Sequence, residues 1–148
     1  LNEKQMISVI FFRGDQVIEV PPAGFKPATL ETKQRIVSWI DPRNHNIIPQ
    51  GKSNPVPALE RAMKYRPQLI FLLSDNITGE GAYAVDQRKL LTAINQANTT
   101  GTKINTIQFL YPDPLARLGL PGTMELIAKN SGGVYKFLNQ DELKIKIR

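Results

Sequence analysis

The sequence predicts an α/β fold in which helices cover both faces of a mostly parallel sheet. In the second half of the chain, apolar strand-like runs alternate with helix-like segments, and such connections give parallel neighbouring strands. Near the start, Arg13-Gly14-Asp15 lies between two strand-like stretches and is typical of a tight hairpin, which would supply one antiparallel edge. With 148 residues, the chain is expected to form a single domain spanning 1–148.

The first half contains the predicted hairpin and one helix. Met6–Phe12 is rich in β-branched and aromatic residues, which predicts a strand buried on both faces, and Gln16–Val20 is its expected partner. Thr29 is a typical capping residue for a helix that runs to about Ile40. The residues expected to face inward on this helix are Leu30, Val37 and Ile40.

The second half begins with a helix that Pro55 opens and that Arg66 and Pro67 end. Its expected apolar face consists of Val56, Leu59, Ala62 and Met63. The elements expected to follow are a buried strand at Leu69–Leu73, a helix from about Ala84 to Ala97, a strand at Ile104–Phe109, a short helix capped by Thr123 and ended by Gly132 and Gly133, and a strand at Val134–Phe137.

Composition excludes several classes of protein. The chain has no cysteine, which excludes a disulfide framework, a thiolate metal site and a cysteine nucleophile, and which is compatible with either redox compartment. No apolar run approaches the roughly 18 residues of a membrane helix, so we expect no membrane insertion. The net charge is +6, but the basic residues are scattered and not interleaved with stacking aromatics, so we expect no nucleic-acid partner.

Two polar stretches are predicted at the same end of the sheet. Gly51-Lys52-Ser53-Asn54 precedes a helix, and Ser74-Asp75-Asn76 follows a strand. The carboxyl ends of parallel strands are where α/β sheets bind ligands. Hydroxyl and carboxylate oxygens are the ligands that Mg²⁺ prefers.

At these stretches the sequence resembles a von Willebrand factor type A domain. Ser53 matches the hydroxyl of the family's GGT-like loop, and Asp75 matches the carboxylate of its TDG-like turn. Ile127-Ala128 followed by Ser131-Gly132-Gly133-Val134-Tyr135 is similar to the family's closing helix, turn and strand. The resemblance implies a three-layer αβα, Rossmann-like fold.

The resemblance also implies a function. Such a module binds a protein ligand, carries out no chemistry on a substrate, and uses a metal-ion-dependent adhesion site in which an acidic residue of the partner completes the coordination of a divalent ion. The implied metal ligands here are Ser53 and Asp75. The residues expected to line the rim of the binding surface are Asn54, Asn76 and Thr78.

Three departures from the family pattern limit this expectation. Lys52 replaces the second glycine of the loop, Asn76 replaces the glycine after Asp75, and the DxSxS motif with its strand is absent. The resemblance therefore implies an amino-terminally truncated domain that lacks its first central strand. We expect the gap to be closed by pairing of the flanking strands, by dimerisation or by strand exchange. The resemblance is compatible with a Mg²⁺ site in the intact protein. This chain alone is expected to lack such a site.

Two other interpretations remain. Lys52 and Asn76 favour a metal-free structural or assembly module of the same fold, in which Ser53 caps a helix and Asp75 caps a turn. A small hydrolase would combine His45 with Asp75 and with Ser53 or Ser74, although no GxSxG motif supports it. Arg13-Gly14-Asp15 spells the integrin-binding tripeptide, but glycine and aspartate are also favoured in tight turns.

Overall fold

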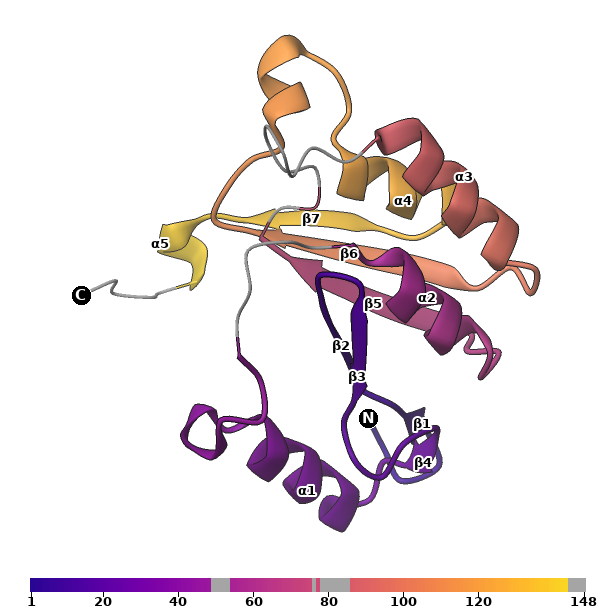
Figure 1. The fold of residues 1–148 in the computed structure, drawn as a ribbon, viewed down its shortest axis with the longest axis vertical. Coiled ribbons are helices and arrows are strands. Elements are labelled where there is room, and N and C mark those ends of the chain that lie inside the picture. Colours follow the sequence, from indigo (N-terminus) through magenta and orange to yellow (C-terminus); the bar gives the residue numbers. More distant parts are fainter. Residues whose placement is uncertain (49–53, 76, 78–85, 144–148) are drawn as a thin grey trace. The chain divides into compact units, whose positions relative to one another are not determined.

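A computed structural model describes residues 1–48, 54–75, 77 and 86–143. Within them the chain is a mixed α/β protein (Figure 1). It divides into two compact units, an amino-terminal unit of Leu1–Tyr65 and a carboxyl-terminal unit of Arg66–Arg148. Each unit has its own strands, helices and buried side chains.

The amino-terminal unit contains two antiparallel pairs of strands. Strands β2 (Ile10–Arg13) and β3 (Gln16–Glu19) form the predicted hairpin, and the turn residue Gly14 has a φ of +57° that favours glycine. The expected first strand is shorter than predicted, because β1 (Met6–Ile7) separates from β2 and pairs with β4 (Lys26–Pro27). Among the described residues, the hairpin forms a two-stranded sheet of its own, whereas the sequence predicted it as an antiparallel edge of the parallel sheet.

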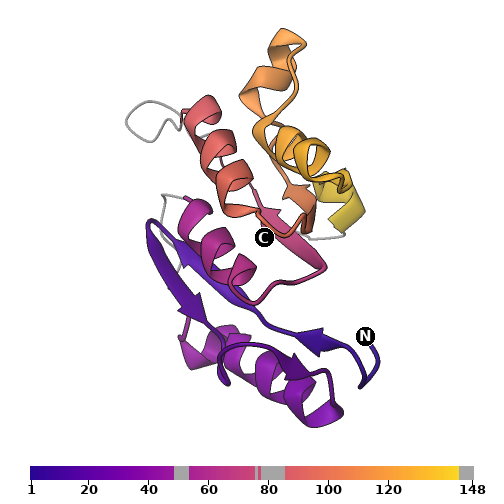
Figure 2. The same ribbon diagram turned by 90° about the vertical axis from the view of Figure 1, so that its right-hand side faces the viewer.

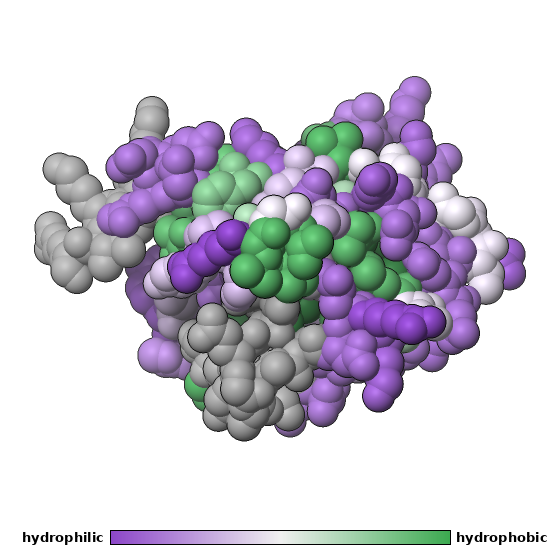
Figure 3. Space-filling view, turned by 90° about the horizontal axis from the view of Figure 1, so that it is seen from above, coloured by the Kyte–Doolittle hydropathy of each residue, from purple (hydrophilic) through white to green (hydrophobic). Residues whose placement is uncertain are grey.

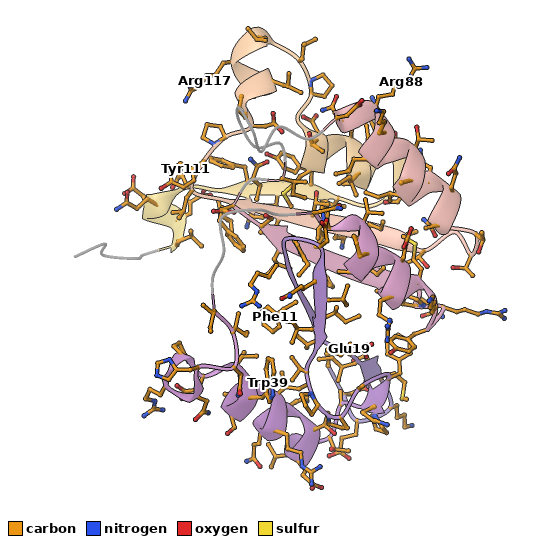
Figure 4. All side chains as sticks on the ribbon, viewed as in Figure 1. Phe11, Glu19, Trp39, Arg88, Tyr111 and Arg117 are labelled. Atoms are coloured by element: carbon orange, nitrogen blue, oxygen red, sulfur yellow. The ribbon has the colours of Figure 1, made fainter. Side chains whose placement is uncertain are left out.

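Helix α1 (Leu30–Ile40) confirms the predicted bounds but not the predicted inner face. The Thr29 hydroxyl caps the helix by accepting a hydrogen bond from the Thr32 amide over 3.2 Å. Leu30 and Val37 are 66% and 64% exposed, so the expectation that they face inward was wrong, and Ile40 is also exposed. The ring of Trp39 instead stacks on Phe11 of β2, with 6.1 Å between the ring centres (Figure 4).

Helix α2 (Val56–Met63) packs on the hairpin and supplies most of this unit's core. Its buried side chains are Ala58, Leu59 and Met63, and Val20 is buried beside the end of β3. Between the two helices lies a 3₁₀ helix, η1 (Pro42–Asn44). Its carboxyl end is His45, an exposed residue in the left-handed conformation whose amide donates to the Pro42 carbonyl over 3.2 Å.

A carboxylate ties β3 to the end of α2 and to the loop between β3 and β4. Glu19 accepts hydrogen bonds from the Tyr65 hydroxyl over 2.7 Å and from the Gly24 amide over 3.1 Å, and it forms an ion pair with Arg61 over 2.8 Å. Its side chain is only 10% exposed. Burial raises the pKa of Glu19. The hydrogen bonds from Tyr65 and Gly24 and the charge of Arg61 lower it by more than burial raises it, so the pKa of Glu19 lies below its ordinary value.

The carboxyl-terminal unit is built on a three-stranded parallel sheet, which confirms the predicted strand direction. The order is β5 (Leu69–Ser74), β6 (Lys103–Phe109) and β7 (Tyr135–Leu138). Helices α3 (Gln87–Ala97) and α4 (Thr123–Ser131) lie side by side on one face of the sheet (Figures 1 and 2). A short helix, α5 (Gln140–Leu143), follows β7.

The core of this unit lies between the sheet and its two helices. Every second residue of β6 is buried, including Ile104, Thr106 and Gln108. Among the described residues of the unit, the other buried apolar side chains are Leu72, Ile77, Leu90, Ile94, Met124, Ile127 and Ala128. Figure 3 views the molecule from above Figure 1, where hydrophilic residues surround a smaller group of hydrophobic ones.

Two sequence predictions for this unit were wrong. Strand β5 is only partly the buried strand that the sequence predicted, because Leu69, Phe71 and Leu73 are 44%, 59% and 48% exposed. Thr123 does not cap α4, because Gly122 occupies the capping position and Thr123 is the first helical residue. None of the helices formed by the described residues has the length and apolar character that crossing a membrane requires.

Candidate functional site

The carboxyl end of the parallel sheet gathers polar residues of the carboxyl-terminal unit. Ser74 is the last residue of β5, and Asp75 follows it directly in an exposed position. The segment after β6 begins with Leu110 and Tyr111, and Tyr111 is 60% exposed (Figure 4). Loops at this end of a parallel sheet are the usual location of a binding site.

Asp113 fixes the loop that follows β6. Its side chain is buried, and its carboxylate accepts hydrogen bonds of 2.9 Å from the amides of Leu115 and Thr123. It therefore caps the 3₁₀ helix η3 (Pro114–Leu118) and also satisfies an amide in the first turn of α4. Gly122 allows this close approach, because a Cβ atom there would lie 2.8 Å from the Cβ of Asp113.

Gln108 connects the same loop to β7. The side chain of Gln108 is buried, and its Nε2 donates to the Tyr111 carbonyl over 2.7 Å. Its Oε1 accepts from the Tyr135 hydroxyl over 3.2 Å. Burial raises the pKa of Tyr135, and the negative charges of Glu125 and Asp113 raise it further, so the phenol stays protonated and remains a donor at neutral pH.

The first turn of α4 is held from two further directions. Gln87 at the start of α3 donates from Nε2 to the Thr123 hydroxyl over 3.1 Å. Thr106 of β6 donates from its hydroxyl to the Met124 carbonyl over 2.8 Å. Together with the hydrogen bonds of Asp113, these bonds fix both ends of the 110–122 segment against the sheet. The segment thereby forms a preorganised rim at the carboxyl end of the sheet.

Three of the five predicted site residues lie outside the described residues. These are Ser53, Asn76 and Thr78. Asp75 lies where the sequence predicted it, directly after β5. Among the described residues, no group of three or more His, Cys, Asp and Glu side chains is placed to hold a metal ion.

Asn54, expected on the rim, joins the hairpin tip to α2. Its Oδ1 accepts from the Val56 amide over 3.1 Å, and its Nδ2 donates to the Asp15 carboxylate over 3.0 Å. The Asn54 amide also donates to the Gly14 carbonyl over 3.3 Å. Asn54 therefore has a clear structural role in the amino-terminal unit.

The Arg13-Gly14-Asp15 tripeptide forms the hairpin tip, as predicted. Both of its charged side chains bond to other residues of the same unit. The Arg13 guanidinium donates to Gln16 Oε1 over 2.6 Å and to the Ile48 carbonyl over 3.3 Å, and Asp15 accepts from Asn54. These contacts support the interpretation of the tripeptide as a turn.

Sequence reasoning missed Asp113, Gln108 and Tyr135. Asp113 had a recognisable signal, because an aspartate followed by proline is typical of a helix start. Gln108 and Tyr135 had none, since a single polar residue within an apolar strand does not reveal its partner on another strand.

Comparison with protein-family models finds no match for this sequence, and comparison with curated proteins finds none either. The type A resemblance stays a prediction. It rests on the order of the motifs, while the structure establishes a mixed α/β protein with a parallel sheet.

Proposed function

We propose that this chain is a protein-interaction module resembling a von Willebrand factor type A domain, which binds a protein ligand at the carboxyl end of its parallel sheet. The observation that carries the proposal is the exposed position of Asp75 directly after β5, at the sheet end where Asp113 and Gln108 hold the neighbouring segment in place. A rigid rim with an exposed carboxylate and an exposed aromatic ring suits recognition of a protein surface.

In the metal-dependent form of this proposal, Asp75 is a ligand of a divalent ion, and Ser53, the other ligand that the resemblance implies, lies outside the described residues. We do not propose Asp113 as a metal ligand, because its buried carboxylate already accepts hydrogen bonds from two backbone amides. Of the two proposed ligands, only Asp75 is among the described residues. One carboxylate is too little charge to displace the water shell of Mg²⁺, so the described residues alone do not make a magnesium site.

A calorimetric titration with Mg²⁺ and Mn²⁺ tests the metal-dependent form of the proposal. The Asp75→Ala variant removes the proposed ligand, and Asp141→Ala is a matched control because Asp141 is an exposed acidic residue on α5. Binding that Asp75→Ala loses and Asp141→Ala keeps would support a metal-dependent site. Binding that both variants keep would contradict a role for Asp75.

The second candidate is a metal-free structural or assembly module of the same fold. The sequence favours it in one respect, because Lys52 and Asn76 replace two glycines of the family pattern. The two candidates differ in the effect of a chelator on partner binding. Loss of binding in EDTA supports the metal-dependent form, and unchanged binding supports the metal-free form.

A further inference from the structure

The outer edge of β5 is an open strand edge within the carboxyl-terminal unit. Among the described residues, the strand pairs with β6 on one side only. The Lys103 amide donates to the Gln68 carbonyl over 3.2 Å, so Gln68 points its backbone groups toward β6. Because these directions alternate along a strand, the backbone groups of Leu69, Phe71 and Leu73 point away from β6.

The sequence of β5 lacks the residues that normally block further pairing. Strand β5 reads Leu-Ile-Phe-Leu-Leu-Ser and contains no charge, proline or glycine. Protected edges usually carry a lysine, a proline or a bulge. The three residues with outward backbone groups are also the three with exposed apolar side chains, at 44%, 59% and 48% exposure.

We propose that β5 pairs in antiparallel fashion with β5 of a second copy of this chain, which makes one continuous sheet across the dimer. Only registers that place outward-pointing residues opposite each other can form this ladder. The register centred on Phe71 places Phe71 opposite its own copy, Leu69 opposite Leu73, and Ile70 opposite Leu72. Every pair within Leu69–Leu73 is then apolar, so the edge is complementary to itself.

Charge at the ends of the strand favours the same partner. Arg66 precedes the strand and Asp75 follows it, and both residues are exposed. Antiparallel pairing places Asp75 of one copy beside Pro67 of the other, one residue from Arg66. The basic end of each strand thus meets the acidic end of the second copy.

The exposed area predicts a weak dimer. The three side chains leave on the order of 300 Å² of apolar surface open in each copy, a patch size that is often functional on a monomer. A standard stable interface buries about 800 Å² per partner. Self-association should therefore appear only at high protein concentration.

Cysteine crosslinking tests the register directly, because the chain has no cysteine of its own. In this register Phe71 and its own copy form a hydrogen-bonded pair. The two Cα atoms of such a pair lie about 5.5 Å apart, which is within reach of a disulfide. Under mild oxidation, Phe71→Cys should form a covalent dimer. Leu69→Cys and Leu73→Cys should each stay monomeric alone and crosslink when mixed. Leu120→Cys is the matched control, since Leu120 is 53% exposed in the same unit but lies outside the sheet.

Sedimentation of the full chain from about 5 to 500 µM, the range of weak complexes, provides a second measurement. The original sequence should self-associate, Phe71→Lys and Phe71→Glu should each be monomeric, and an equimolar mixture of the two should recover dimers because lysine then faces glutamate. A monomer throughout this range would overturn the proposal. Equal crosslinking of Phe71→Cys and Leu120→Cys would overturn it as well.

Discussion

Replacing Glu19 by glutamine tests the carboxylate that joins β3, the end of α2 and the loop between β3 and β4. The substitution keeps the shape of the side chain and removes its charge. Hydrogen bonds to a charged group contribute about 1.5–3 kcal/mol each in favourable settings. The half-exposed Arg61 adds little, because ion pairs open to solvent contribute about 0–1 kcal/mol. We expect Glu19→Gln to lower the free energy of unfolding of the amino-terminal unit by about 2 kcal/mol at pH 7.

The pH dependence of this difference has a definite sign. The pKa of Glu19 is lower in the folded protein than its ordinary value of 4.5, so the unfolded chain binds the proton more tightly. The stabilisation is fully present above pH 4.5 and is lost as the pH falls through the folded pKa. The difference between Glu19→Gln and the original sequence should therefore shrink in acid.

Fluorescence of Trp39 during urea unfolding measures this effect, because it is the chain's one tryptophan and lies in the same unit as Glu19. Glu31→Gln is the matched control. It also removes a glutamate that pairs with an arginine, but that glutamate side chain is 74% exposed, so the expected loss is below about 0.5 kcal/mol. Equal stability of the Glu19→Gln and Glu31→Gln proteins at pH 7 would refute the reasoning.

Three further substitutions test the carboxyl-terminal unit. Leu72→Asp places an unpaired charge at a position only 5% exposed and should cost about 3–5 kcal/mol, so a retained cooperative thermal transition would show that β5 is wrongly placed. Gly133→Ala would drive a Cβ atom into the Ile104 carbonyl oxygen and should cost about 3 kcal/mol in chemical denaturation, whereas an unchanged midpoint would mean that the α4–β7 connection is different. Tyr135→Phe removes the donor to Gln108 and should lower the free energy of unfolding by about 1–2 kcal/mol. The free energy of unfolding should stay unchanged only if a water molecule replaces the hydroxyl.

The sequence predicted the elements better than their environments. The hairpin, the Thr29 cap and the parallel order of β5, β6 and β7 follow from turn chemistry, side-chain oxygens and strand–helix alternation, which are local properties. Helix α1 shows a case in which the local sequence does not determine which face of a helix is buried. Its sequence has two apolar stripes, one with Leu30 and Val37 and another with Trp39, and only the position of Phe11 selects the second.

The candidate site was predictable to a similar extent. Asp75 was found because it directly follows a strand, whereas Gln108 and Tyr135 meet only through the pairing of β6 with β7. The exposure of Phe71 was missed for a related reason. An apolar run is compatible with burial on both faces, and the run alone does not show whether a second layer covers the strand.

Site-specific photocrosslinking tests the central claim most directly, namely that the carboxyl end of the parallel sheet is the surface that binds a protein. A photoreactive amino acid would replace Tyr111 on the rim, and the same amino acid would replace Arg88 on α3 as a control, since both positions are exposed (Figure 4). In an extract of the source cells, we predict a discrete protein adduct at position 111 that is absent at position 88 and that is lost in an Asp75→Ala background. An adduct at position 88 alone, or adducts of equal yield at both positions, would contradict the account.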